Sequence, residues 1–327
     1  TGETRSASST CIVNAAGPWV DQVLASGVTG SERLMGGTKG SHIVVQPFSG
    51  APADAFYVEA PSDGRPVFII PWNGQYLIGT TDIRYDGDPA DAAASRAEVD
   101  YLLATVNDIF PRAGLQAKDI NFSYAGVRPL PYVQEGPESA ITRRHIIHKH
   151  KGNARGIWSI IGGKLTTYRN LAEQMVDRIE RQLGGVVSNC TTASKPLPGG
   201  ADAERARQDL AAIGGLPAAL VERLLEIYGS RASRLAELCA AEPSLAATET
   251  GRFIAAEVVL AIREEFARTL IDLMHRRLML GLSPDQGRDA APAVAAVAAA
   301  ELGWSKDETN RQMQLFEAYN QRLQPRD

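Results

Sequence analysis

The most constraining stretch of this chain is a short apolar run that passes through two glycines into an amphipathic segment. The run 156–161 precedes Gly162–Gly163, and apolar residues then recur at helical spacing over 165–183. This pattern predicts a buried strand, a tight turn and a helix that begins at or just after Lys164. Paired glycines let a ligand approach the backbone, and a helix N-terminus beside a lysine favours negative charge. The alternative is a purely structural turn with a solvated lysine.

The composition is that of an ordinary globular protein. With 327 residues, 44% apolar content, 22% charged residues and net charge −4, the chain gives no sign of nucleic-acid binding and is long enough for roughly two domains. Cys11, Cys190 and Cys239 are far apart and lack metal-site spacing, which predicts buried thiols in a reducing compartment. We expect no signal peptide and no membrane span, whereas attachment to a membrane surface stays open.

A second strand-to-helix unit lies near the start of the chain. The apolar run from Cys11 ends in Ala16 and Gly17, and Pro18 suits the first turn of a helix. Ligands of doubly wound sheets lie beyond the carboxyl ends of strands, so Ala16 and Gly17 would border a cofactor. A common structural turn is the alternative.

The next region predicts an antiparallel sheet. A glycine-rich stretch leads into an apolar strand at whose start His42 lies, and a lone histidine there is more often structural than catalytic. The apolar runs 67–72 and 76–82 flank Asn73–Gly74, which predicts a β-hairpin. Thr81–Asp82 could bind a ligand or form a turn.

Arg128 ends an apolar strand and has apolar neighbours on both sides. A guanidinium in such a place needs an anion opposite it, which is either a ligand or a structural carboxylate. Arg143 is a second candidate, also expected on a strand, and Arg144 should point the other way. Together with His42 and Lys164, the two arginines could surround a phosphate dianion.

Other segments predict helices that pack rather than react. Ser95–Glu98 is a capping box before the apolar stripe 99–110, which predicts a packing helix without chemistry. Beyond the linker 194–200, we expect helices near 201–213, 217–228, 230–241, 252–280, 289–301 and 306–322. They predict a separate, all-helical C-terminal domain.

Three histidines, His145, His148 and His150, raise the question of a metal site. They lie beside two lysines ahead of Gly152, and no carboxylate triad accompanies them, so a charged hairpin tip explains them better. We therefore expect no metal.

Six motifs, in one order, resemble the FAD-dependent glycerol-3-phosphate dehydrogenases of the respiratory, quinone-linked kind. They are GPW at 17–19, KGSH at 39–42, IPW at 70–72, GTTD at 79–82, GVRPL at 126–130 and GGKLTTYR at 162–169. The family's NATGPW string has Ala16 in place of threonine here. The resemblance covers most of the chain, from about residue 11 to 320, and the order is more specific than any single motif.

The resemblance implies an α/β plus α chain in three parts. They are the remnant of a Rossmann-like FAD-binding domain at 1–34 and 152–193, an antiparallel-sheet substrate domain at 35–151 and the helical domain at 194–327. No Gly-x-Gly-x-x-Gly turn occurs in the sequence, and the chain opens at Thr1 rather than at a methionine. We therefore expect an inactive fragment without the ADP-binding half of the FAD domain.

The implied reaction is oxidation of sn-glycerol 3-phosphate to dihydroxyacetone phosphate. Hydride would pass from C2 to N5 of FAD, and electrons would go to quinone at the surface of the cytoplasmic membrane, where the cytoplasmic protein is peripherally attached. The catalytic residues that the resemblance implies are His42, Arg128, Arg143 and Lys164, with His42 facing the substrate and the arginines at its phosphate end. An oxidase that uses O₂ and a non-catalytic module that binds phosphorylated ligands are the alternatives, and a homodimer stays open.

The same resemblance implies a set of cofactor contacts from the two strand-to-helix turns. The residues are Ala16, Gly17, Gly162, Gly163, Lys164, Leu165 and Thr166. Lys164 and the N-terminus of its helix would stabilise negative charge on the reduced flavin ring.

Overall fold

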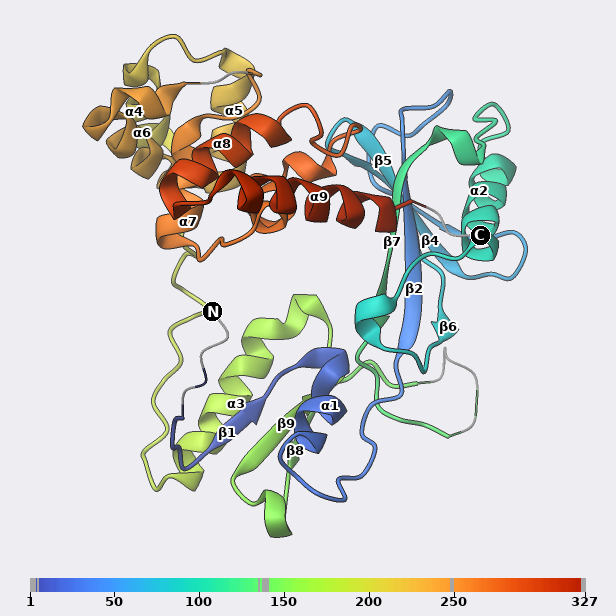
Figure 1. Ribbon diagram of the computed structural model, residues 1–327. Coiled ribbons are helices and arrows are strands. Elements are labelled where there is room, and N and C mark those ends of the chain that lie inside the picture. The colour runs from blue at the N-terminus through green and yellow to red at the C-terminus, as the bar shows by residue number, and fades with distance from the viewer. Residues whose placement is uncertain (1–3, 5, 135, 137–140, 248–249, 325–327) are drawn as a thin grey trace.

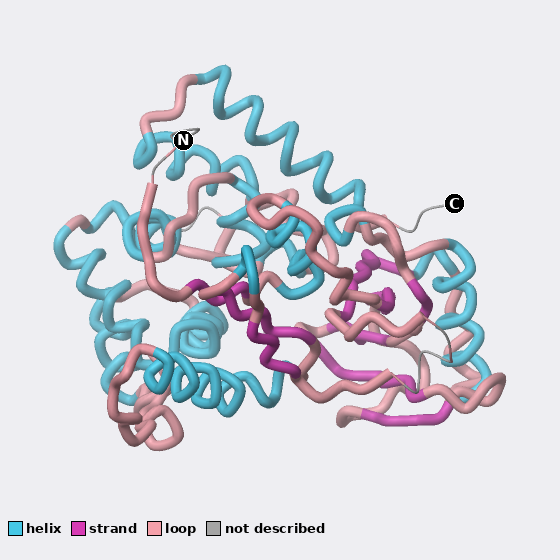
Figure 2. The backbone as a smooth tube through the Cα atoms, turned by 90° about the horizontal axis from the view of Figure 1, so that it is seen from below, coloured by secondary structure: helices cyan, strands magenta, loops and turns pink. Residues whose placement is uncertain are grey.

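The computed structural model describes residues 4, 6–134, 136, 141–247 and 250–324. Figure 1 shows three parts, namely a small sheet, a larger sheet and a cluster of helices. Figure 2, turned by 90°, shows strands of both sheets towards the middle of the molecule with helices around them. The predicted α/β plus α class is confirmed.

The small sheet holds both predicted strand-to-helix units. Its strands, in spatial order, are β1 (Ile12–Asn14), β9 (Ile157–Ile161) and β8 (Ile146–Lys149). β1 runs parallel to β9, and β8 runs antiparallel to it. The helical segments are η1 (Gly17–Trp19), α1 (Val20–Ala25), η5 (Gly152–Ala154), η6 (Leu165–Thr167) and α3 (Tyr168–Gln182). Because β1 and β9 are parallel, the turns that follow them lie at one edge of the sheet.

The predicted domain ranges stay a prediction. One strand within the range 35–151, β8, pairs with β9 in the small sheet and not with the larger one. The predicted start of the helix after Lys164 is confirmed, since η6 begins at Leu165 and continues into α3.

The larger sheet is antiparallel and centred on β2. Its strands are β2 (Thr38–Val45), β3 (Phe56–Glu59), β4 (Pro66–Trp72), β5 (Gln75–Gly79), β6 (Ile83–Arg84) and β7 (Ile120–Arg128). The order is β3-β4-β5-β2-β6, and β7 pairs with β2. Asn73 and Gly74 join β4 to β5 with φ of 50° and 70°, so the predicted hairpin is confirmed. His42 lies in the middle of β2 rather than at its start.

One face of this sheet is covered by α2 (Arg96–Ile109). The Ser95–Glu98 capping box is present, and the apolar stripe of the helix packs on Ile43 and Ile69 in a shared core. Two short 3₁₀ turns, η2 (Pro89–Asp91) and η3 (Ala117–Asp119), flank the helix. Because strand side chains alternate, the opposite face is left for other partners.

The C-terminal part is helical, as predicted. Its segments are α4 (Glu204–Ile213), α5 (Ala218–Tyr228), η7 (Gly229–Arg231), α6 (Ala232–Ala241), η8 (Pro243–Ala246), α7 (Ala255–Glu264), η9 (Asp272–Arg277), η10 (Leu280–Leu282), α8 (Ala291–Leu302) and α9 (Lys306–Arg322). Among the helices that the structure describes, none is both long enough and apolar enough to cross a membrane.

The single helix expected over 252–280 is wrong. The Ala267 N–H bonds back to the Ala261 carbonyl, which closes α7, and Phe266 takes a positive φ of 61°. Asp272 then accepts from the backbone of Thr269 at 3.0 Å and starts a new helical segment. The expectation of buried thiols fails for Cys190, which is exposed beyond α3.

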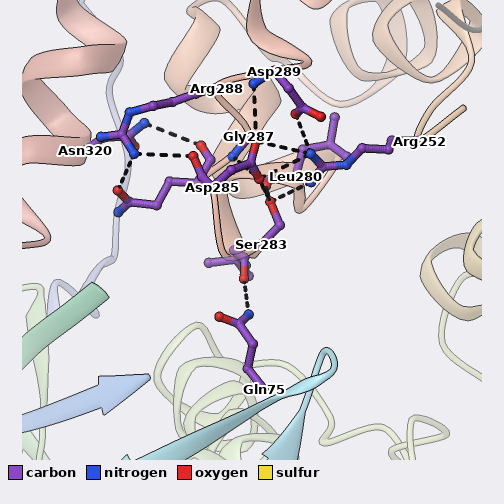
Figure 3. Close-up of polar contacts among 11 residues, drawn as sticks. Gln75, Arg252, Leu280, Ser283, Asp285, Gly287, Arg288, Asp289 and Asn320 are labelled. Atoms are coloured by element: carbon purple, nitrogen blue, oxygen red, sulfur yellow. Dashed lines mark hydrogen bonds and ion pairs between the residues drawn. The ribbon is translucent and has the colours of Figure 1, made fainter. Parts of the chain in front are cut away.

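A polar contact fastens the helical part to the hairpin of the larger sheet. Gln75, at the start of β5, donates from Nε2 to the Leu282 carbonyl at 2.9 Å (Figure 3). Behind it, Arg252 contacts Asp285 at 3.2 Å and Ser283 at 2.5 Å. This network fixes the loop that touches the hairpin.

The same two parts meet again at β7. The buried Ser123 N–H of β7 donates to the Leu323 carbonyl at 2.6 Å, beyond α9. Gln324 donates to the Asn121 carbonyl at 3.4 Å. Because β7 pairs only with β2 among the described strands, these bonds cover part of its open edge.

Candidate active site

A row of rings crosses the face of the larger sheet that α2 leaves free. His42 pairs with Gly79 of β5 and with Tyr124 of β7, and Gly79 also pairs with Phe68 of β4. Residues directly opposite each other across antiparallel strands share a face, so these side chains lie together. The imidazole of His42 stacks on Tyr124 with ring centroids 4.8 Å apart and planes inclined by 10°.

Two glycines make room for His42 and Arg128 on this face. A Cβ at Gly79 would overlap the His42 ring, and a Cβ at Gly40 would overlap the guanidinium of Arg128 and the hydroxyl of Thr80. Glycine inside a strand often marks such a close approach. That signal was present in the sequence, in the GSH and IGTT strings.

Arg128, at the end of β7, already has an anion opposite it. Its Nη1 donates to Asp82 Oδ1 at 3.0 Å, and its Nη2 donates to Thr80 Oγ1 at 3.1 Å and to the Thr81 carbonyl at 3.0 Å. The Arg128 side chain is 23% exposed and that of Asp82 is 14% exposed. The structural carboxylate predicted as one alternative is therefore present. Two of the five guanidinium donors still lack a partner in these bonds, and they are free for a ligand.

Arg143 shares the carboxylate of Asp82, with Nη2 at 3.5 Å from Oδ2. Its side chain is half exposed, and it lies in an irregular segment before β8, so the expectation that it sits on a strand is wrong. Arg144 also lies outside the described strands, and its backbone N–H donates to Thr142 Oγ1 at 3.2 Å. The local hydroxyl contact replaces the strand ladder there.

His42 is uncharged at neutral pH. Burial, and then the charge of Arg128, lower the pKa of His42 to about 4. Its Nδ1 is buried and has no hydrogen-bond partner among the described residues.

The glycine turn is tied directly to this cluster. Gly162 and Gly163 have φ of 72° and 96°, which side chains rarely adopt. The Gly162 N–H donates to the Pro129 carbonyl at 2.7 Å, one residue beyond Arg128. One hydrogen bond therefore joins the glycine turn to the segment that directly follows Arg128.

The predicted cofactor residues lie at the edge where β1 and β9 end. Gly17 has φ of 59° and opens η1, just as Gly163 precedes η6. Lys164 has no ion-pair partner within the part of the chain that the structure describes, and Leu165 is 88% exposed. First-turn N–H groups, a free ammonium and an uncovered apolar side chain fit the flat, partly apolar ring of a flavin. The Gly-x-Gly-x-x-Gly string that is typical of a pyrophosphate-binding turn does not occur in the sequence.

Sequence reasoning missed one member of the neighbourhood. Glu98 lies on the helix predicted to be without chemistry, is buried, and accepts from Thr81 Oγ1 at 2.7 Å. The capping box predicts a hydrogen bond to one oxygen of the Glu98 carboxylate. No nearby residue in the sequence predicts the bond to the other oxygen, because Thr81 belongs to a different segment.

Comparison with known proteins gives two family matches and several close relatives. Residues 1–169 match the FAD dependent oxidoreductase family, and residues 190–309 match the C-terminal domain of alpha-glycerophosphate oxidase. A glycerol-3-phosphate dehydrogenase of Synechocystis is 41% identical over 322 residues, covering 94% of this chain and 58% of the relative. D-erythritol 1-phosphate dehydrogenase of Brucella abortus is 38% identical over 288 residues, covering 85% and 56%.

A solved structure is also similar. The glycerol-3-phosphate dehydrogenase from Bacillus halodurans, complexed with FAD, superposes with a TM-score of 0.78 at 29% identity, covering 96% of this chain and 62% of that one. The chain thus spans somewhat more than half the length of the relatives that it matches. The likeness extends over all three parts of the fold.

Proposed function

The chain belongs to the family of FAD-dependent glycerol-3-phosphate dehydrogenases, and from this premise we propose that the whole protein oxidises sn-glycerol 3-phosphate to dihydroxyacetone phosphate. The observation that carries the proposal is the cluster of Arg128, Asp82 and Arg143 beside an uncharged His42. The cluster would offer an anion site next to a proton acceptor.

The two arginines would bind the phosphate end of the substrate. Guanidinium groups bind phosphate oxygens with paired, charge-assisted hydrogen bonds. Asp82 holds Arg128 in place from one side, so the guanidinium is ordered before a ligand arrives. The half-exposed Arg143 could swing onto the ligand from the solvent side.

His42 would take the proton of the substrate's C2 hydroxyl. The imidazole is neutral and can accept it, and a dianion bound at Arg128 would offset the positive charge that helps to lower the pKa of His42. The histidine would therefore become a stronger base when substrate is present.

The glycine turn would hold the flavin end of FAD, the cofactor of the family. Bound FAD would supply the hydride acceptor. Ala16, Gly17 and Gly162–Gly163 would let the backbone approach a ring. Leu165 and Thr166 belong to the first helical turn, whose N–H groups would face that ring. Lys164 would place its charge where negative charge develops on reduction.

The electron acceptor has two candidates. We infer quinone as the acceptor, with the protein peripherally attached to the cytoplasmic membrane surface. An oxidase that passes electrons to O₂ is the second candidate, favoured by the match of residues 190–309 to an alpha-glycerophosphate oxidase domain. Peroxide formation during turnover in air separates the two, and sedimentation with lipid vesicles tests the attachment.

Ligand binding to the chain itself tests the proposed substrate class. In isothermal titration, sn-glycerol 3-phosphate should bind, and glycerol, which lacks the phosphate, should not. D-erythritol 1-phosphate serves as a longer comparator, since it is the substrate named for one relative. Equal binding of glycerol and its phosphate would overturn the assignment of Arg128 and Arg143.

A further inference from the structure

Among the described residues, the acceptors that hold the Arg128 guanidinium all come from the segment 80–82, which follows β5. One is the Thr80 hydroxyl, one is the Thr81 carbonyl and one is the Asp82 carboxylate. The orientation of the guanidinium therefore depends on where this short segment lies. The segment is three residues long and links β5 to β6, and its Thr81 N–H donates to the Ser41 carbonyl of β2 at 3.4 Å.

A buried carboxylate behind the segment also helps to hold it in place. Glu98 Oε1 accepts from Thr81 Oγ1 at 2.7 Å and from Ser41 Oγ at 2.8 Å. Thr81 Oγ1 in turn accepts from the Ser41 N–H at 2.9 Å. Thr81, Ser41 and Glu98 are each less than one-tenth exposed, so water does not compete for these bonds.

The second oxygen of Glu98 is bound just as fully. Oε2 accepts from Lys39 Nζ at 2.7 Å, from the Ser95 N–H at 3.0 Å and from Ser95 Oγ at 2.8 Å. Burial alone raises the pKa of Glu98, but Lys39 and the hydrogen bonds outweigh it and lower the pKa to about 2. The carboxylate is therefore charged at every physiological pH.

A buried ion pair is a weak source of stability, because desolvation of both charges offsets their attraction. The capping box needs only one oxygen of Glu98. The other oxygen reaches across to the segment that holds Arg128. This division points to a role in geometry.

We propose that Glu98, together with Lys39, is a positioning residue for Arg128: it fixes Thr81 and thereby aims the free donors of the guanidinium at the ligand. The inference rests on the proposed function, since it concerns the same anion site. Glu98 does not touch the ligand, and its effect passes through Thr81.

The helical part offers a matched control. Glu257 also occupies the third position of a helix, accepts from the N-cap N–H of Ile254 at 3.1 Å and pairs with an arginine, Arg223, at 2.9 Å. Its side chain is 0% exposed. No hydrogen bond of Glu257 reaches the residues around Arg128. Glu257→Gln should therefore reproduce the loss of a buried charge without its effect on the site.

The test compares Glu98→Gln, Thr81→Val, the double variant and Glu257→Gln by thermal melting and by titration with sn-glycerol 3-phosphate and with inorganic phosphate. We expect both glutamine variants to lower the melting temperature. Of these two glutamine variants, only Glu98→Gln should weaken ligand binding, by at least about tenfold, and Thr81→Val should weaken it as well. The double variant should bind the ligand no more weakly than whichever single variant has the lower affinity. Both changes break the same hydrogen bond, the one between Glu98 and Thr81, so their effects should not add.

Several outcomes overturn the inference. One is a folded Glu98→Gln protein that binds the ligand as tightly as the original protein. Another is a Glu257→Gln protein that loses as much affinity as Glu98→Gln. A third is that the losses of affinity caused by Glu98→Gln and Thr81→Val add in the double variant. If Glu98→Gln does not fold, Thr81→Val, which removes one hydroxyl, decides by itself. If the unaltered chain fails to bind either ligand, the anion site itself is refuted; if it binds and Glu98→Gln binds equally, only the positioning role is refuted.

Discussion

The substrate side and the cofactor side of the candidate site are prepared to different degrees. On the larger sheet, Arg128 is mostly buried and makes three hydrogen bonds, and His42 is stacked on an aromatic ring. At the glycine turn, Lys164 has no ion-pair partner within the described residues and Leu165 is almost fully exposed. On the first side the predicted site residues are held by other side chains, whereas on the second Lys164 and Leu165 extend from a turn without such partners among the described residues.

This difference says where substitutions should act. A residue that is held by its neighbours contributes both to folding and to binding, so its replacement should alter stability as well as affinity. A residue that waits for its partner should alter function alone. The following predictions run from the largest expected effect to the smallest.

Gly40→Ala should break the prepared side most severely. The added Cβ would overlap the Arg128 guanidinium and the Thr80 hydroxyl. We expect a loss of about 1–3 kcal/mol in the free energy of unfolding and loss of substrate binding. Gly126→Ala is the control for stability, since its Cβ meets no atom within 4 Å. Chemical denaturation measures the stability of both variants, and titration with sn-glycerol 3-phosphate measures binding. Equal stability of the two variants would contradict the close fit at Gly40.

Arg128→Ala should weaken substrate by more than about 2 kcal/mol, the scale for removing one partner of a desolvated charge pair. Lysine at the same position keeps the charge but not the fork, so it should restore only part of the affinity. Titration with sn-glycerol 3-phosphate provides the measurement. Unchanged affinity would contradict a ligand-binding role and leave Arg128 only its structural ion pair with Asp82.

Lys164→Met should change the cofactor side without changing stability. If the ammonium stabilises only the reduced flavin, its loss should lower the flavin reduction potential by ~30 mV, or ~1.4 kcal/mol, and leave substrate affinity nearly intact. Redox titration of the FAD-loaded full-length protein measures the first effect, and melting of the chain measures stability. An unchanged potential with a large rise in KM would move Lys164 to the phosphate site.

The pH dependence should be slight above pH 5. The pKa of His42 is lowered to about 4, so the free protein keeps its imidazole neutral and kcat/KM should fall only as pH drops towards that value. Arg128→Ala removes one of the two causes, so the acid limb should shift upward, towards pH 6.5. NMR titration of the His42 ring measures its pKa in the original protein and in Arg128→Ala, and the pH profile of kcat/KM measures the acid limb. An acid limb that does not move would remove Arg128 as a cause.

The parts of the fold that could be predicted depend on neighbouring residues. Three local features could be predicted because each depends on a few adjacent residues. They are the Asn73–Gly74 turn, the Ser95–Glu98 capping box and the Gly162–Gly163 turn. The break in the expected helix over 252–280 was missed, because the positive φ of Phe266 follows from how the chain reverses and not from helix propensity.

The parts of the site that could not be predicted join distant elements. The need for an anion opposite Arg128 could be inferred from its apolar neighbours, but Asp82 stands 46 positions away. The bond between Glu98 and Thr81 likewise crosses from a helix to a loop. Pairings of this kind are set by the packing of α2 on the sheet, which the local pattern does not encode.

The bond from Ser123 to Leu323 has a consequence for the order in which the protein is made. Ser123 belongs to β7, the strand that ends in Arg128, and its buried N–H gains its partner from a residue 200 positions later. On the ribosome, the edge of the larger sheet must therefore stay incompletely bonded while the whole helical part is synthesised. The substrate face forms early in sequence but is sealed late in time, and during that interval an open strand edge is exposed to chaperones and to pairing with other chains.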